Sequence, residues 1–164
     1  SLFLCILNQY YKSDYIYYIY LATISASMAD SWATEIGNNF KGVTYNITNL
    51  NKIKKGLSGG VSLHGTIGSI IGSSIIGGIG FIFNTPLIFC IFIILSGLSG
   101  CIIDSILGAT VQTRYIDIVD AKVTESNNKN RFYFSGFKYF DNNLVNLVGT
   151  TSGGAIMFFY LIIS

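Results

Sequence analysis

The sequence predicts an all-α protein: a polytopic transmembrane helix bundle with about five spans, forming a single transmembrane domain over residues 1–164. Three observations lead to this prediction. The chain is poor in charge, its apolar residues gather in runs of near span length, and its basic residues fall in alternate loops. Charged residues make up 11% of the chain, whereas an average soluble domain has about 25%. The 18 glycines and single proline are typical of transmembrane helices that pack closely.

Apolar runs define the expected spans, which cover residues 1–11, 15–29, 65–83, 87–103 and 144–163. A span needs about 20 residues. We therefore interpret the first run as the end of a helix whose beginning is missing, in a chain truncated at its N-terminus. The runs lack the period-2 alternation of barrel strands, and helices are the other way to satisfy backbone groups in hydrocarbon.

The charges indicate which loops share a side of the membrane. Five alternating spans place the loops at about 30–64 and 109–143 on one face, and nine of the ten Lys and Arg residues lie in these two loops. The positive-inside rule then predicts that both loops are cytoplasmic. We expect a multi-pass protein of an endomembrane or plastid-type membrane, with the lipid bilayer as a partner and no nucleic acid.

Carboxylates mark the cytoplasmic ends of the expected spans. Asp30 and Glu35 follow the second span, and Asp104 ends the fourth. Charged groups at membrane depth are costly, so they usually line a cavity or pair with another group. Carboxylates suit Mg²⁺, which makes Asp30 and Asp104 the candidate metal ligands. The alternative is that these residues are interfacial caps and counter-ions for lysines.

Asp30 and Glu35 are five residues apart, which separates them by about 140° around an ideal helix. Two side chains on one straight helix cannot then both face the same small ligand. We expect the helix to break or end between them, or one of them to face a neighbouring helix.

A basic, glycine-containing loop precedes the third long run. Lys54 and Lys55 supply point charges for phosphate oxygens, and glycines such as Gly59 and Gly60 let backbone N–H groups approach an anion near a helix N-terminus. The Gly-Lys-Ser/Thr order of a Walker A loop is absent. The loop therefore predicts phosphate binding of another kind.

Four motifs together resemble the family of transmembrane protein 19. They are ADSWATEIG at 29–37, GGVSLHGT at 59–66, GCIIDSILGAT at 100–110 with Gln112, and DNNLVN at 141–146. They occur in the family's order and cover residues 29–149, most of the chain. More distantly, the pattern is similar to polyprenol and dolichol kinases.

The resemblance implies a polytopic helical protein. Because the family includes the plant phytyl-phosphate kinase, it also implies phosphate transfer from a nucleotide to a prenyl phosphate. Carried over by motif, the implied site positions are Asp30, Glu35, Gly59, Gly60, Gly65, Asp104, Asn142, Asn143 and Asn146. For the three asparagines, which share a helix face, hydrogen bonding between helices is an adequate alternative.

The function that we predict is a membrane lipid kinase acting on an isoprenoid phosphate. Its catalytic residues would be Asp30, Glu35 and Asp104, and its cofactors Mg²⁺ and a nucleoside triphosphate, ATP or CTP. The acceptor phosphate is already ionised at neutral pH, so positioning and charge neutralisation are sufficient for catalysis. The alternatives are an ion-coupled transporter or channel with acidic residues near mid-bilayer, and a membrane scaffold without catalytic activity.

Overall fold

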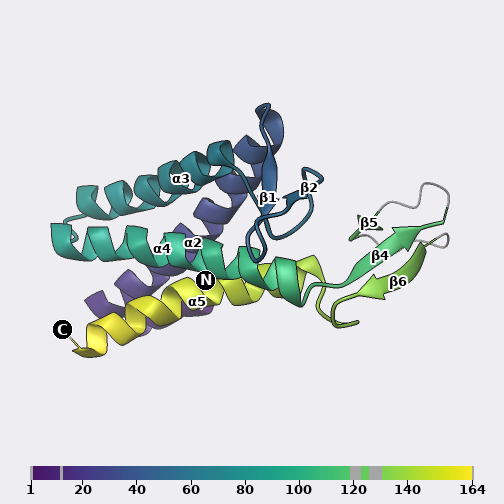
Figure 1. Cartoon of the computed structure of the whole chain (residues 1–164). Coiled ribbons are helices and arrows are strands. Elements are labelled where there is room, and N and C mark those ends of the chain that lie inside the picture. The colour runs from purple at the N-terminus through teal and green to yellow at the C-terminus, as the bar shows by residue number, and fades with distance from the viewer. Residues whose placement is uncertain (1, 12, 119–122, 126–130, 164) are drawn as a thin grey trace.

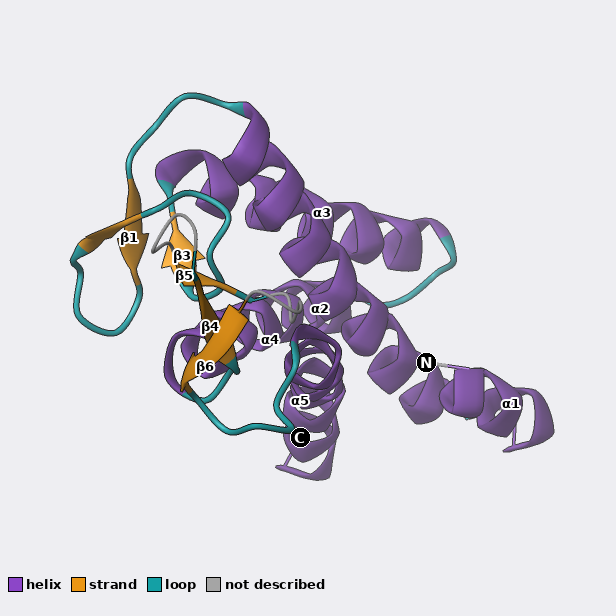
Figure 2. Cartoon of the chain, turned by 90° about the vertical axis from the view of Figure 1, so that its right-hand side faces the viewer, coloured by secondary structure: helices purple, strands orange, loops and turns teal. Residues whose placement is uncertain are grey.

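The computed structural model describes residues 2–11, 13–118, 123–125 and 131–163. These residues form a mostly helical chain (Figure 1). Its helices are α1 (Leu2–Tyr11), α2 (Asp14–Asn39), α3 (Leu63–Ile82), α4 (Leu87–Thr110) and α5 (Asn142–Ile163). Figure 1 shows α3, α4 and α5 side by side, and Figure 2 shows α1 lying outside this group.

Among the described residues, three helices are long and apolar enough to cross a membrane: α3, α4 and α5. The five expected spans are therefore not confirmed. With 10 residues, α1 is about 15 Å long, half of the hydrocarbon thickness. The 26-residue α2 is long enough, but Asp14, Asp30 and Glu35 and its many hydroxyl side chains make it less apolar than the other three.

The centre of the bundle is α2, which packs on α3, α4 and α5. Beyond Tyr18 and Leu21, the buried residues of α2 are small, among them Ala22, Ser25, Ala26 and Ala29. Partner glycines meet these residues: a Cβ added to Gly100 would lie 2.7 Å from the Ala26 Cβ. Small residues on both sides let the helix backbones approach closely, as in other membrane bundles.

The larger apolar side chains form a core in one half of the bundle. This core contains Tyr18, Leu21, Ala22, Ile76, Ile93 and Met157. The Tyr18 ring stacks on Phe89 with centroids 4.6 Å apart. All these residues belong to the half of each helix that is remote from the two long loops. The half near the loops is lined by glycine and polar residues instead.

The two long loops contain small antiparallel sheets, so the all-α prediction is wrong there. The first sheet has the order β2-β1-β3, formed by β1 (Thr44–Asn46), β2 (Lys52–Ile53) and β3 (Gly60–Val61). The second has the order β5-β4-β6, formed by β4 (Arg114–Asp117), β5 (Val123–Thr124) and β6 (Arg131–Ser135). The strands have two to five residues, too short to stand out among polar loop residues. Their β-branched and aromatic side chains are the local signal for strand.

Both sheets lie at the same end of the bundle (Figures 1 and 2). This is the end where α2 and α4 finish and where α3 and α5 begin. The two long loops therefore share one side of the protein, as the alternating pattern of spans predicts. Lys122 and Lys129, two of the nine basic loop residues, lie outside the described residues.

Candidate functional site

A cavity of about 530 Å³ opens at the end of the bundle that carries the sheets. Its walls come from the last turns of α2, the first turns of α3 and α5, the last turns of α4, and the loop at 56–62. At this end of the bundle the partially positive N-termini of α3 and α5 lie beside the partially negative C-termini of α2 and α4. The cavity size is in the usual range for a small-molecule site.

Most of the residues singled out from the sequence line this cavity. They are Asp30, Glu35, Gly59, Gly60, Gly65, Asp104, Asn142 and Asn146. Residues from four helices and a loop thus converge as the sequence predicts. Their catalytic and cofactor-binding roles remain predictions.

No break separates Asp30 from Glu35, because α2 is continuous from Asp14 to Asn39, which leaves the alternative that one of them faces a neighbouring helix. Both residues nevertheless line the cavity, together with Ser31, Thr34 and Asn38. The cavity wraps around the end of α2 and takes in more than one face of the helix. A separation of about 140° is therefore compatible with one shared cavity.

Asp104 is held against α5. A Cβ added to Gly149 would lie 2.8 Å from Asp104 Oδ2, so only glycine leaves room for the carboxylate there. In the amide orientation that satisfies both of its polar atoms, Asn146 donates from Nδ2 to Asp104 Oδ2 at 3.2 Å and to the Asn142 carbonyl at 3.1 Å. These contacts fix one carboxylate oxygen. They also show that Asn146 makes the hydrogen bond between helices that the sequence offered as an alternative role.

Asp30 and Asp104 stand on neighbouring helices in the cavity wall, and their carboxylates are close enough to interact electrostatically. Glu35 and Glu125 add two more carboxylates, whereas no Lys, Arg or His among the described residues lines the cavity. Two carboxylates in one cavity wall are accommodated either by a cation between them or by a proton held by one of them.

The donor set fits Mg²⁺ but does not form a complete protein cage. No group of three His, Cys, Asp or Glu side chains in the described part of the chain is placed to hold a metal ion. Mg²⁺ is usually held by one or two carboxylates together with substrate phosphates and water. Asp30 and Asp104 could therefore hold Mg²⁺ when phosphate oxygens complete its coordination.

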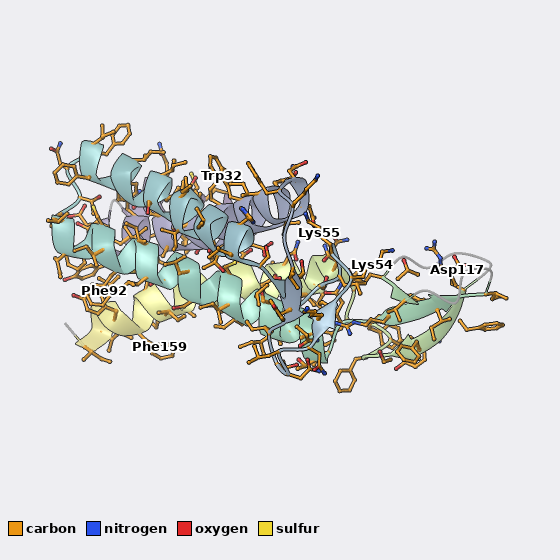
Figure 3. The ribbon with its side chains drawn as sticks, turned by 45° about the horizontal axis from the view of Figure 1, so that its top comes forward. Trp32, Lys54, Lys55, Phe92, Asp117 and Phe159 are labelled. Atoms are coloured by element: carbon orange, nitrogen blue, oxygen red, sulfur yellow. The ribbon has the colours of Figure 1, made fainter. Side chains whose placement is uncertain are left out.

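Lys54, Lys55 and Asn143 do not line the cavity. Figure 3 shows Lys54 and Lys55 near the strands. The Lys55 ammonium donates to the carbonyl of Phe40, the residue that caps the C-terminus of α2. A cation there complements the helix dipole, so Lys55 has a structural partner. Asn143 is exposed on the first turn of α5.

The glycine pair packs the loop onto α4. Gly59 has a φ of +77°, and an added Cβ would lie 2.5 Å from Ala109. The N–H of Gly60 donates to Leu57 at 3.1 Å, which closes a turn. At Gly65, the N–H donates to the Ser62 Oγ at 3.1 Å and caps α3. The N–H groups of Gly60 and Gly65 are thus already paired, contrary to the expectation that such glycines offer N–H groups to an anion.

Glu125, a cavity residue that sequence reasoning missed, joins the two long loops. Its carboxylate accepts from the Ser58 N–H at 2.6 Å and from the Ser58 Oγ at 2.9 Å. Arg114 donates to the carbonyls of Ser58 at 3.1 Å and Gly108 at 3.0 Å. Ser58 is 56 residues from Arg114 and 67 residues from Glu125 in the sequence. No local motif could therefore have signalled these contacts.

Comparison with known proteins gives the family. Residues 1–154 match the family described as Integral membrane protein DUF92. Protein PGR of Arabidopsis thaliana is 32% identical over 131 residues, which covers 73% of this chain and 46% of that protein. An uncharacterized membrane protein of Methanocaldococcus jannaschii is 23% identical over 137 residues, covering 84% of this chain and 48% of that protein.

The chain thus spans about half the length of the curated relatives that it matches. No solved structure matches it. These matches confirm the resemblance to the transmembrane protein 19 family that the four motifs indicated. The chain belongs to the DUF92 family of multi-pass integral membrane proteins.

Proposed function

We propose that this chain carries the site of a nucleotide-dependent lipid kinase that acts on an isoprenoid monophosphate. The observation that carries the proposal is the convergence of Asp30 and Asp104 on one cavity between apolar helices. A phosphoryl-transfer site needs hard oxygen ligands for a metal ion and a place for phosphate groups at a helix N-terminus. The cavity offers Asp30 and Asp104 as oxygen ligands, and the first turns of α3 and α5 contribute to its lining.

In the proposed reaction, an oxygen of the isoprenoid phosphate attacks the γ-phosphorus of the nucleotide. The bond from that phosphorus to the β–γ bridging oxygen breaks, and the products are an isoprenoid diphosphate and a nucleoside diphosphate. The acceptor needs no strong general base, because its oxygens are already anionic. A site with carboxylates and amides but no described histidine in its wall is sufficient for this chemistry.

Each of the cavity residues has a proposed role that follows from its position. Asp30 and Asp104 would hold Mg²⁺, which would supply charge neutralisation for the phosphoryl group. Asn146 keeps Asp104 in its orientation through the 3.2 Å hydrogen bond. Asn142, at the start of α5, and Glu35, at the end of α2, orient polar parts of the two substrates at the cavity rim. The cavity lining has no Lys or Arg among the described residues, so the phosphates depend on the metal ion for charge neutralisation.

The outer surface suits the bilayer. On α3, Ile67, Ile71, Ile75 and Ile79 are all exposed in the isolated chain, and α4 and α5 expose further large apolar side chains. Because α2 packs on all three apolar helices, we infer that it crosses the membrane at the same depth. Two of its hydroxyl residues, Thr23 and Ser25, are buried against the other helices and so are kept away from lipid.

A second candidate, an ion-coupled transporter, is favoured by one observation. The hydroxyls of Ser25 on α2 and Ser96 on α4 are buried and have no hydrogen-bond partner within the protein. They lie deeper in the bundle than Asp30 and Asp104. Polar groups that extend inward from an acidic cavity are a feature of ion pathways.

The test is a lipid-kinase assay of the full-length protein in lipid nanodiscs, with labelled ATP and CTP and a panel of prenyl alcohols and monophosphates. We expect Mg²⁺-dependent label transfer to a prenyl monophosphate, and loss of that transfer in Asp30→Asn and Asp104→Asn. No transfer to any acceptor, combined with cation uptake into proteoliposomes that either substitution abolishes, would support the transporter instead.

A further inference from the structure

The cavity is bordered by both α3 and α4, and its side between these two helices faces the bilayer. These helices pack tightly at the turn that joins them, where a Cβ on Gly77 would lie 2.5 Å from Ile94. Towards the other end, α3 packs on α2: a Cβ on Gly68 would lie 2.5 Å from the carbonyl oxygen of Trp32, and one on Gly72 would lie 2.7 Å from that of Met28. The glycines thus bring α3 close to α2, and α4 forms the other side of the cavity.

Two isoleucines stand at the mouth of the cavity between α3 and α4. Ile70 on α3 and Ile102 on α4 both line the cavity, yet their exposed fractions are 47% and 52%. A residue that lines a cavity and is also half exposed lies at the edge of its opening. Since the exposed sides of α3 and α4 face lipid, the cavity opens sideways into the membrane.

The lining changes from polar to apolar along the helix axes. Leu98 precedes Asp104 by six residues and so lies about 9 Å deeper towards the middle of the bundle. On α3, Ile70 lies about 7.5 Å deeper than Gly65. The aliphatic lining residues of α3 and α4 therefore lie towards the bilayer centre, beside Ser69 and Cys101, while α2 contributes Asp30. An aliphatic strip on the side of α3 and α4 matches the tail of an amphiphile with its head outward.

We propose that a single linear isoprenoid chain enters the cavity from the bilayer between α3 and α4 and lies against Ile70, Leu98 and Ile102. Its phosphate then lies beside Asp104. This inference rests on the proposed function for the identity of the head group. It adds the route of access and the residues that contact the tail.

The test uses the full-length protein in lipid nanodiscs and a geranylgeranyl monophosphate with a diazirine on its tail. After irradiation, the labelled residues are mapped by mass spectrometry. We expect labelling at Ile70, Leu98 and Ile102, and competition by excess unlabelled geranylgeranyl monophosphate. Equal labelling of the outer faces of α3, α4 and α5, unaffected by the competitor, would overturn the inference.

Matched variants provide a second measurement. Ile70→Trp and Ile102→Trp place a bulky ring at the mouth and should reduce competed labelling about 10-fold. The controls Ile71→Trp and Leu95→Trp change residues that are 42% and 50% exposed on the same two helices but do not line the cavity. Unchanged labelling in well-folded Ile70→Trp and Ile102→Trp proteins would also overturn the inference.

The outcome is separable from that of the kinase proposal. Competed labelling at these residues without phosphoryl transfer from ATP or CTP would keep the lipid site and remove the kinase assignment. If Ile70→Trp and Ile102→Trp both transfer phosphate at the normal rate, and the label falls on other residues, the kinase proposal stands. The proposal of entry between α3 and α4 is then wrong.

Discussion

Asn146 on α5 donates its side-chain amide to Oδ2 of Asp104 on α4 at 3.2 Å, across a helix contact where Gly149 leaves room for the carboxylate. This relationship ties an acidic residue of the cavity to the first turns of another helix. Asp104 therefore enters the cavity with one oxygen already oriented. A carboxylate preorganised in this way is better suited to hold a metal ion than a freely rotating one.

The first prediction tests the charge of Asp104. Asp104→Asn keeps the size of the side chain but removes the anion, so prenyl-phosphate kinase activity should fall roughly 100-fold or more. Expression and membrane insertion should survive, because neutralising a charge in a membrane helix eases insertion. The measurement is phosphoryl transfer per mole of folded protein.

Asp14→Asn is the matched control, since Asp14 is exposed in the first turn of α2 and does not line the cavity. It should retain wild-type activity. A fully active Asp104→Asn protein would remove the support for a metal-binding role at this position.

The second prediction concerns Asn146 as a positioning residue. Asn146→Ala removes the donor to Asp104, and activity at limiting Mg²⁺ should fall about 10–100-fold, the range for partners of metal ligands. Excess Mg²⁺ should restore part of the loss, which a purely structural defect would not allow. Asn143→Ala, on the exposed side of the same turn, should leave the Mg²⁺ dependence unchanged.

The third prediction tests the close packing of α2 and α4. A Cβ at Gly100 would meet the Ala26 Cβ at 2.7 Å and the Gly149 carbonyl oxygen at 2.8 Å, so Gly100→Ala should destabilise the bundle by about 1–3 kcal/mol. Thermal unfolding in detergent measures the effect. Gly78→Ala is the control, because nothing lies within 4 Å of its added Cβ. That substitution should leave stability unchanged or raise it, as alanine favours the helix.

The fourth prediction concerns topology. In a background with Cys5→Ser and in sealed organelle vesicles with the cytoplasmic face outward, a cysteine at Leu50 should react with an impermeant thiol reagent. Leu50 lies in the first sheet loop with 71% exposure, so access within the protein is not limiting. A cysteine at Asn84, in the turn between α3 and α4, should be protected in the same vesicles and react only after detergent opens them. The reverse pattern would contradict the cytoplasmic assignment of the long loops.

The sequence by itself determined the family, the membrane class and most of the cavity residues. Long apolar runs have few folding options in a bilayer, because every backbone group must be paired within a helix. Asp30, Asp104 and Asn146 could be placed near one end because each lies close to the end of such a run. Helix geometry then fixes their depth, since each residue adds about 1.5 Å.

Only the tertiary structure decided how the loops complete the cavity. Lys55 pairs with the end of α2, the Gly60 N–H closes a turn, and Glu125 reaches Ser58 across 67 residues of sequence. It also decided that α2 stays continuous while the cavity wraps around its end, and that short strands form in both loops. Loop side chains take their positions from hydrogen bonds to distant segments. Such partners leave no periodic trace in the sequence, unlike the apolar runs that bury a helix in lipid.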